Sequence, residues 1–151
     1  MMTFIIKKAT FLLALFLLTA AACASSGNEP ITVTDPWGRT SPAVANNGVF
    51  YMTLTNNGES DDALLAIASD ACDILELHEM YDRGEGLMGM RPVAGGAIPV
   101  PAGDSTALEP GGLHAMCLGK QIDFAAGTEV PLTLSFENAG EMEVTAVIRD
   151  N

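Results

Sequence analysis

The chain contains few of the residues on which several common protein classes depend. Its 151 residues include three cysteines, two histidines and seven lysines or arginines, against nineteen acidic residues. Three cysteines are too few for a scaffold held together by disulfides. Because basic residues are so scarce and form no stripe, the sequence excludes a protein that binds the phosphates of nucleic acid.

The sequence also has none of the usual enzyme motifs. It contains no Ser-His-Asp spacing, no glycine-rich phosphate loop and no nucleotide fingerprint. Carboxylates are plentiful, but without a pattern that forms a pocket they are best interpreted as a solvated surface. We therefore predict that the protein is not an enzyme.

The N-terminus has the pattern of an export signal, which we assign to residues 1–22. Lys7 and Lys8 precede an apolar run at residues 11–18, and small residues follow at 19–22. The apolar run is too short to remain as a membrane-spanning helix. These features predict a protein of the periplasm or of the outer face of a bacterial membrane.

Signal cleavage is predicted after Ala22 or after Ala24. The first alternative leaves Cys23 at the new N-terminus, in a segment that resembles a loose bacterial lipoprotein box with Ala20 in place of a larger aliphatic residue. Cys23 is therefore the predicted lipidation site, and residues 23–30 form a short polar tether. A lipid there is the only membrane contact that we predict. Without the signal, five basic residues oppose nineteen acidic ones, a formal net charge of −14 that attracts cations and positively charged partners.

The remaining residues, 31–151, are predicted to form one all-β domain. Short alternating segments are separated by turns rich in Gly, Pro, Asn and Asp, and no long helical period is present. Residues 62–68 are a weaker strand, with a short helix as the alternative, and residues 35–37 and 94–101 are predicted turns. This pattern indicates an antiparallel β-sandwich. The predicted strands are residues 31–34, 49–55, 62–68, 73–80, 87–93, 105–108, 113–118, 130–136 and 141–148.

Both histidines of the chain lie two residues before a methionine. These pairs are His78 with Met80 and His114 with Met116. Because side chains alternate along a strand, each histidine shares a face with its methionine, and we expect both faces to be exposed. The pattern favours a metal site over methionines that merely fill a core.

A further pair, Met88 and Met90, lies between the two histidine segments. Neutral imidazoles and thioethers form a soft, uncharged ligand set that suits Cu(I) and suits Zn²⁺, Mg²⁺ or Ca²⁺ poorly. Cys117 lies on the face opposite the predicted ligands, which disfavours a blue-copper electron-transfer site. Cys72 and Cys117 remain either a disulfide or two buried thiols at this stage.

The histidine and methionine spacing resembles the signature of the PCuAC-type periplasmic copper chaperones. That signature is a histidine, a methionine twelve residues later, and then His-x-Met; here these residues are His78, Met90, His114 and Met116. The twenty-three residues between Met90 and His114 are two more than is usual in the family, and Glu79 replaces a frequent methionine. The likeness covers residues 31–148, with further matching segments at residues 37–40, 51–56, 75–78, 90–93, 110–114 and 130–136.

The resemblance implies a cupredoxin-like Greek-key sandwich that carries Cu(I). It makes His78, Met90, His114 and Met116 the copper ligands. Met80 shares a strand face with His78, and Met88 shares one with Met90, so both are predicted as auxiliary thioethers. It further implies a monomer that delivers copper to the binuclear copper centre of a respiratory cytochrome c oxidase, either directly to the copper-accepting subunit or through another copper chaperone. A periplasmic copper-buffering or resistance protein using the same site is the main alternative.

Overall fold

The computed structural model describes residues 30–150, in which ten strands form one continuous sheet. The predicted export signal, Cys23 and nearly all of the tether therefore lie outside the described residues. In the described part, no helix has the length and apolar character needed to cross a membrane. The elements are β1 (Ile31–Arg39), β2 (Asn47–Asn56), β3 (Asp62–Ala68), β4 (Cys72–Asp82), β5 (Met88–Pro92), the 3₁₀ helix η1 (Ala94–Gly96), β6 (Ile98–Val100), β7 (Ser105–Leu108), β8 (Leu113–Lys120), β9 (Glu129–Phe136) and β10 (Gly140–Arg149).

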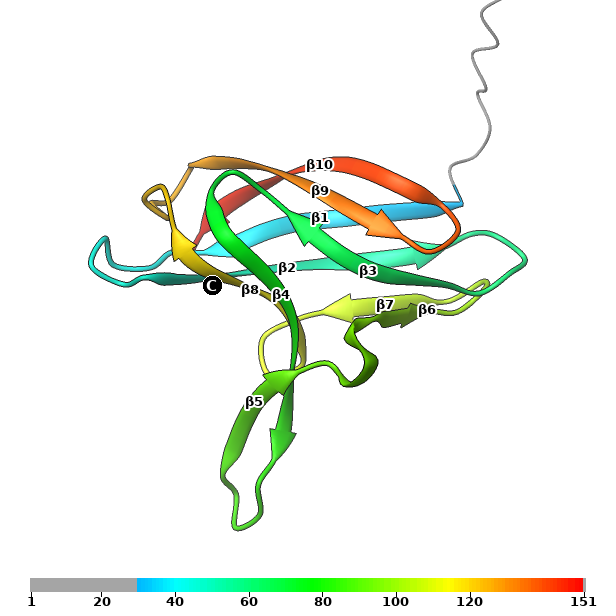
Figure 1. Cartoon of the computed structure of the whole chain (residues 1–151), viewed down its shortest axis with the longest axis horizontal. Coiled ribbons are helices and arrows are strands. Elements are labelled where there is room, and N and C mark those ends of the chain that lie inside the picture. Colours follow the sequence, from blue (N-terminus) through cyan, green and yellow to red (C-terminus); the bar gives the residue numbers. More distant parts are fainter. Residues whose placement is uncertain (1–29, 151) are drawn as a thin grey trace, which may run out of the picture.

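The strands are hydrogen-bonded in the order β5-β4-β8-β7-β2-β1-β10-β9-β3-β6, and β8 also pairs with β2. Neighbours are antiparallel except for β1 with β10 and β7 with β8, which are parallel. The sheet bends so that β3 and β4, each next to one end of it, pack against each other without being hydrogen-bonded. The sheet thereby encloses a core, and the β4–β5 hairpin projects from the body (Figure 1). The all-β sandwich prediction is confirmed, with two parallel pairings added.

The core is built from the inward-facing residues that alternate along each strand. In β9, Val130, Leu132 and Leu134 are all essentially inaccessible, and the same is true of Phe50 and Leu54 in β2. Apolar burial of this kind is the main favourable term in folding. The period-two pattern that predicted these strands thus also identified their inner face.

Two predicted elements differ from the structure, and one alternative is settled. Residues 62–68 form strand β3, so the helical alternative is wrong. Residues 94–101 are not one long turn, because they contain η1 and the short strand β6. Ile98 and Val100 of β6 are fully buried, and this burial against the core outweighs the turn signals of the prolines and glycines around them.

The predicted turn at residues 35–37 is instead a bulge inside the continuous strand β1. The pairing of β1 with β2 shifts by one residue between Thr34 and Trp37, and Asp35 has a φ of 49°. Asp tolerates this left-handed backbone region better than most residues. Because the bulge adds one residue, it moves Trp37 and Arg39 to the outer face of the sheet. There the Trp37 ring lies against Tyr51 of β2, with 4.7 Å between ring centroids.

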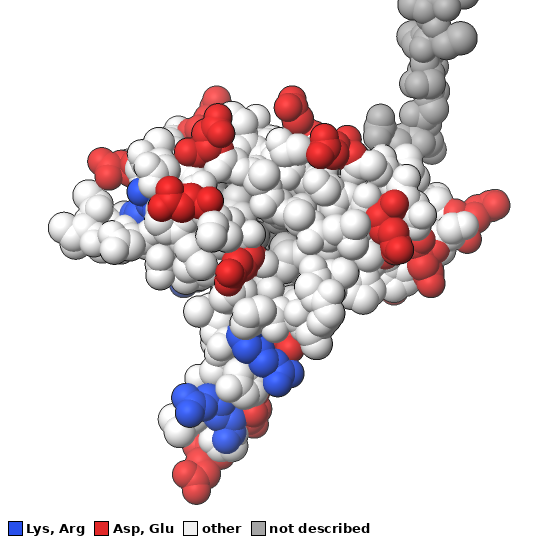
Figure 2. Space-filling view, viewed as in Figure 1, with Lys and Arg blue, Asp and Glu red and all other residues white. Residues whose placement is uncertain are grey.

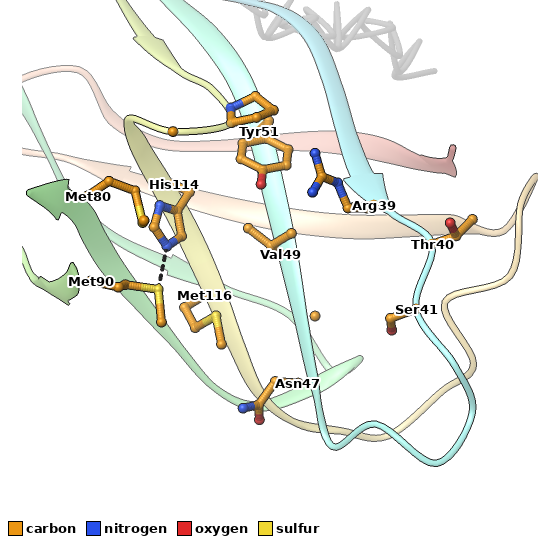
Figure 3. A pocket seen from close by; sticks show the side chains of 13 residues that line it. Arg39, Thr40, Ser41, Asn47, Val49, Tyr51, Met80, Met90, His114 and Met116 are labelled. Carbon is orange, nitrogen blue, oxygen red and sulfur yellow. Dashed lines mark hydrogen bonds between the residues drawn. The ribbon is translucent and has the colours of Figure 1, made fainter. Parts of the chain in front are cut away.

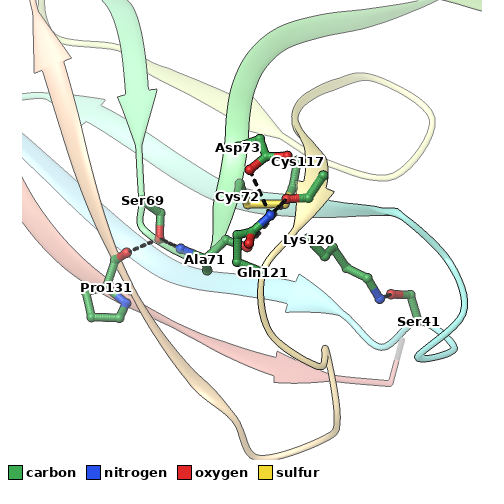
Figure 4. The surroundings of a disulfide bond; sticks show 10 residues. Ser41, Ser69, Ala71, Cys72, Asp73, Cys117, Lys120, Gln121 and Pro131 are labelled. Atoms are coloured by element: carbon green, nitrogen blue, oxygen red, sulfur yellow. Dashed lines mark hydrogen bonds between the residues drawn. A yellow bond between two sulfur atoms is a disulfide. The ribbon is translucent and has the colours of Figure 1, made fainter.

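Cys72 and Cys117 form a disulfide, which decides between the two alternatives left open by the sequence (Figure 4). The bond joins the start of β4 to β8, and both cysteines are buried. Beside it, the Gln121 side-chain amide donates to the carboxylate of Asp73 at 2.7 Å. The disulfide therefore ties together the two strands that carry the histidines.

Charge is distributed unevenly between the body and the hairpin. On the face seen in Figure 2, acidic side chains are scattered over both the body and the β4–β5 hairpin, while most of the basic side chains in view lie on the hairpin, which carries Arg83 and Arg91. Arg91 is itself paired with Glu79 at 2.8 Å. This face therefore presents no continuous basic stripe of the kind that binds nucleic acid.

The disulfide should contribute substantially to stability because it closes a loop with a sequence separation of 45 residues. We expect the Cys72→Ser/Cys117→Ser double variant to lose about 2–4 kcal/mol of unfolding free energy, measured by urea denaturation. Reductant should destabilise the wild-type protein by a similar amount and leave the double variant unchanged. Equal stability of oxidised and reduced wild-type protein would contradict this role.

Candidate metal centre

The pairing of β4 with β8 brings the two histidines together. His78 lies directly opposite His114, and Glu76 lies opposite Met116. On the other face of the same strands, Leu77 lies opposite Ala115 in the core. The predicted alternation is therefore correct for both strands.

The β4–β5 hairpin adds the remaining methionines to the same face. Met80 lies opposite Met90, and Met88 lies opposite Asp82, closer to the hairpin tip. The structure thus brings the predicted ligands together from three neighbouring strands, although they are far apart in sequence.

The His114 ring is oriented by a backbone carbonyl. Its Nδ1 lies 3.1 Å from Gly112 O, and its Nε2 lies 3.0 Å from Met90 Sδ (Figure 3). Because a carbonyl oxygen can only accept a hydrogen bond, the neutral ring carries its proton on Nδ1. The Nε2 lone pair then faces the lone pairs of the thioether sulfur, an arrangement that a soft cation between them would stabilise.

The His78 ring is oriented in the opposite sense by a carboxylate. Its Nε2 lies 2.8 Å from Glu76 Oε2, so Nε2 donates and carries the proton of the neutral ring. Its Nδ1 is buried and has no hydrogen-bond partner among the described residues. An orphaned buried acceptor is unfavourable unless something binds it, and a carboxylate that fixes the tautomer of a metal-binding histidine is a recurrent arrangement. Glu76 lies two residues before His78 and therefore shares its strand face, but no pattern in the sequence indicates a role for it.

Both histidines are more buried than the sequence suggested. Only 8% of His78 and 5% of His114 is exposed, so the expectation of exposed faces is wrong for the imidazoles. The neighbouring strands and hairpin cover them, while Met90 is 46% exposed. Burial lowers the pKa of His114, partly opposed by its hydrogen bond to Gly112 and reinforced by nearby His78. His114 therefore remains neutral and able to bind a metal at neutral pH.

A cleft of about 380 Å³ opens over this part of the sheet. Met80, Met90, His114 and Met116 line one side, and residues of β1 and β2, including Arg39 and Tyr51, line the other (Figure 3). His78 is not among the lining residues, but its ring lies 5.8 Å from that of His114 between centroids. Met88 does not line the cleft either.

Arg39 and Tyr51 are cleft residues that the sequence analysis did not identify. Tyr51 lies in an alternating strand whose sequence has no other feature of a metal site. Arg39 reaches this face only because of the bulge in β1. No local pattern in the sequence could have placed either beside His114.

The donor chemistry of the site is selective. In residues 30–150, no group of three or more His, Cys, Asp or Glu side chains is arranged to hold a metal ion. A site here must therefore use methionine sulfur as well as imidazole nitrogen. Such donors fit Cu(I) and do not fit Ca²⁺ or Mg²⁺, which require oxygen ligands.

The chain matches a family of lipoproteins. A family model described as "LpqE-like: Putative lipoprotein LpqE-like" matches residues 31–148. "Putative lipoprotein Lxx21020" of Leifsonia xyli subsp. xyli (strain CTCB07) is 30% identical over 97 residues, which cover 64% of this chain and 57% of that protein. The match thus spans less than two thirds of that relative's length.

Solved structures with the same fold are PCuAC domains. The apo PCuAC domain from PmoF1 is 25% identical, with a TM-score of 0.67 over 81% of this chain and 95% of that chain. CuI-DR1885 from Deinococcus radiodurans is 26% identical, with a TM-score of 0.66 over 87% of each chain. The resemblance to PCuAC-type proteins predicted from the sequence is therefore confirmed.

The hydrogen bonds predict opposite tautomers for the two histidines of the metal-free protein. Long-range ¹H–¹⁵N NMR of the neutral imidazoles should show the proton on Nε2 of His78 and on Nδ1 of His114. Glu76→Gln should give a mixed tautomer population for His78 because the carboxylate acceptor is lost, whereas Glu79→Gln should not. A His78 tautomer that is insensitive to Glu76→Gln would contradict the role of this carboxylate.

Proposed function

Because the chain belongs to the LpqE-like family, we propose that it is an exported Cu(I)-binding metallochaperone of the PCuAC type. The observation that carries this proposal is the convergence of imidazole and thioether groups on one sheet face, with His114 Nε2 only 3.0 Å from Met90 Sδ. One structural neighbour is described as CuI-DR1885, and this description supports copper as the cargo.

The proposed ligands are His78, Met90, His114 and Met116. Each side chain lies on the same face of the β5-β4-β8 part of the sheet. The lone pair on His114 Nε2 and the orphaned Nδ1 of His78 are the nitrogen positions left free by the hydrogen bonds of the metal-free protein. The fit of these residues to copper therefore rests on their own chemistry as well as on their spacing.

Such a site would hold copper and still release it. Imidazole and thioether are neutral ligands, and both cysteines within residues 30–150 are in the disulfide, so neither supplies a thiolate to anchor the ion. Met90, half-exposed at the cleft, is the thioether that an incoming ligand would replace first. Met80 lines the same cleft and serves as an auxiliary thioether, while Met88 lies farther along the hairpin and has a weaker claim.

Two other functions fit less well. A blue-copper electron-transfer site needs a cysteine thiolate, but Cys117 is bonded to Cys72 and buried on the opposite face. An enzyme would need catalytic groups in a recognisable arrangement, whereas the sequence has no catalytic motif and the one imidazole that lines the cleft is accompanied by three thioethers, which transfer no protons. Binding and exchange of copper account for these residues without a catalytic step.

We place this exchange outside the cytoplasm, on the strength of the predicted export signal and the lipoprotein names of the family and of its relative. A lipid on Cys23 would hold a monomeric chain at the membrane surface and raise its effective concentration near a membrane-bound acceptor. The proposed recipient is the binuclear copper centre of a respiratory cytochrome c oxidase, reached directly or through another copper chaperone.

Anaerobic Cu(I) titration against a competing chelator tests the ligand set. Combined His114→Gln and Met116→Leu substitution should weaken Cu(I) binding on the order of 100-fold or more. Loss of a residue that only hydrogen-bonds a metal ligand typically costs about 10–100-fold, and loss of two direct ligands should cost more. Met142→Leu, on β10 away from the cleft, is the matched thioether control and should bind as the wild-type protein does. Unchanged affinity in the double variant would rule out this site.

Gene deletion separates delivery from copper buffering, since both functions would use the same ligands. When copper is limiting, a chaperone deletion should lower the copper content and activity of the oxidase, and excess copper should restore both. Loss of copper tolerance with normal oxidase loading would instead identify a buffering or resistance protein.

A further inference from the structure

The cleft contains an arginine, Arg39, whose side chain has no hydrogen-bond or ion-pair partner among residues 30–150. Its Nε is buried. By contrast, Arg91 and Arg149 each bond a carboxylate. An unsatisfied buried donor of this kind is costly, and it is unexpected in a chain with nineteen acidic residues.

Tyr51 adds a second donor beside Arg39. Its hydroxyl makes no hydrogen bond to another described side chain or backbone group. Its ring contacts Trp37, and the Cζ atom of Arg39 lies 5.9 Å from the centroid of the Tyr51 ring. Burial raises the pKa of Tyr51, with Arg39 acting in the opposite direction. The hydroxyl therefore stays protonated near neutral pH and can donate. Arg39 and Tyr51 lie side by side across the cleft from Met90 (Figure 3).

A guanidinium and a hydroxyl together suit a carboxylate. Arginine presents several N–H donors in a planar fork that matches two carboxylate oxygens, and the phenol can supply one more donor. The cleft volume of about 380 Å³ is large enough for a side chain with part of its backbone. Because His114 and Met90 line the same cleft, a group bound to Arg39 would lie close to the proposed copper ligands.

We propose that Arg39 and Tyr51 form a carboxylate-binding subsite for an Asp or Glu side chain of the protein that exchanges copper with this chain. One observation favours a protein side chain over a free anion. Met90, which lines the cleft, is 46% exposed, and Met88 is 54% exposed on a hairpin that projects from the body, as expected for apolar groups that contact a partner.

The subsite would contribute specificity more than affinity. An acidic chain repels most acidic partners, and a single positive group beside the copper ligands selects a partner whose carboxylate has the matching position. The bound carboxylate would orient a neighbouring methionine or histidine of the partner toward the proposed copper ligands. The choice of a copper-exchanging partner rests on the proposed function, whereas the carboxylate chemistry rests on Arg39 and Tyr51 alone.

Two blocked dipeptides test the subsite on the metal-free mature chain. Acetyl-Glu-Met-amide carries one carboxylate and one thioether, and acetyl-Gln-Met-amide is its uncharged counterpart. In NMR titrations of the wild-type protein, the Glu dipeptide should bind about fivefold more tightly, the difference expected for a partly exposed ion pair. This preference should disappear in Arg39→Gln, decrease in Tyr51→Phe and persist in Arg83→Gln, which alters an exposed arginine on the hairpin.

Further measurements separate this subsite from the copper site. Arg39→Gln should leave Cu(I) affinity unchanged, and Arg39→Lys should retain part of the dipeptide preference, which keeps the test valid if Arg39→Gln folds poorly.

Equal binding of the two dipeptides by the wild-type protein, or a preference that survives Arg39→Gln, would overturn the proposal. Acetate that competes as strongly as the Glu dipeptide would overturn the assignment to a partner side chain. A preserved preference in a chain that fails to bind Cu(I) would refute the proposed function and leave the subsite standing.

Discussion

The candidate site depends on the pairing register between β4 and β8. Because side chains alternate along a strand, the register that places His78 opposite His114 also places Leu77 opposite Ala115 in the core. A slip of one strand by a single residue would turn its imidazole into the apolar core and turn its core side chains to the outer face. The Cys72–Cys117 disulfide joins the same two strands and opposes such a slip. The packing of the core and the geometry of the site are thus two consequences of one register.

The outer face of the sheet is continuous from β1 to β5, and the bulge in β1 determines what that face carries. Without the extra residue between Thr34 and Trp37, Arg39 would have the opposite parity and would point toward the core. With it, Arg39 lies over Tyr51, and Tyr51 lies near His114, with 6.5 Å between ring centroids. A backbone irregularity in the first strand thereby brings a cation close to a site built mainly from three other strands.

The two histidines are held differently, and the difference has a chemical consequence. The Gly112 carbonyl orients His114, whereas the Glu76 carboxylate orients His78. Each acceptor receives a hydrogen bond from the N–H of one ring nitrogen, so the other nitrogen of the neutral ring carries no proton. Because both rings are buried, few water molecules can satisfy the free nitrogens. The metal-free protein therefore keeps two oriented imidazoles, each with one ring nitrogen that can bind a soft cation.

Local patterns in the sequence were sufficient for nine of the ten strands and for the shared face of each histidine and its methionine, because alternation depends only on neighbouring residues. The spacing of His78, Met90, His114 and Met116 likewise indicated the PCuAC-type family. Local patterns could not decide the disulfide, the burial of the histidines, the continuation of β1 through the bulge, or the positions of Arg39 and Tyr51. Those features depend on which strands pair and in what register, and the pairing of β4 with β8 joins residues more than thirty positions apart. Tertiary contacts, rather than any local preference, determine that pairing, so only the folded chain shows what surrounds the two histidines.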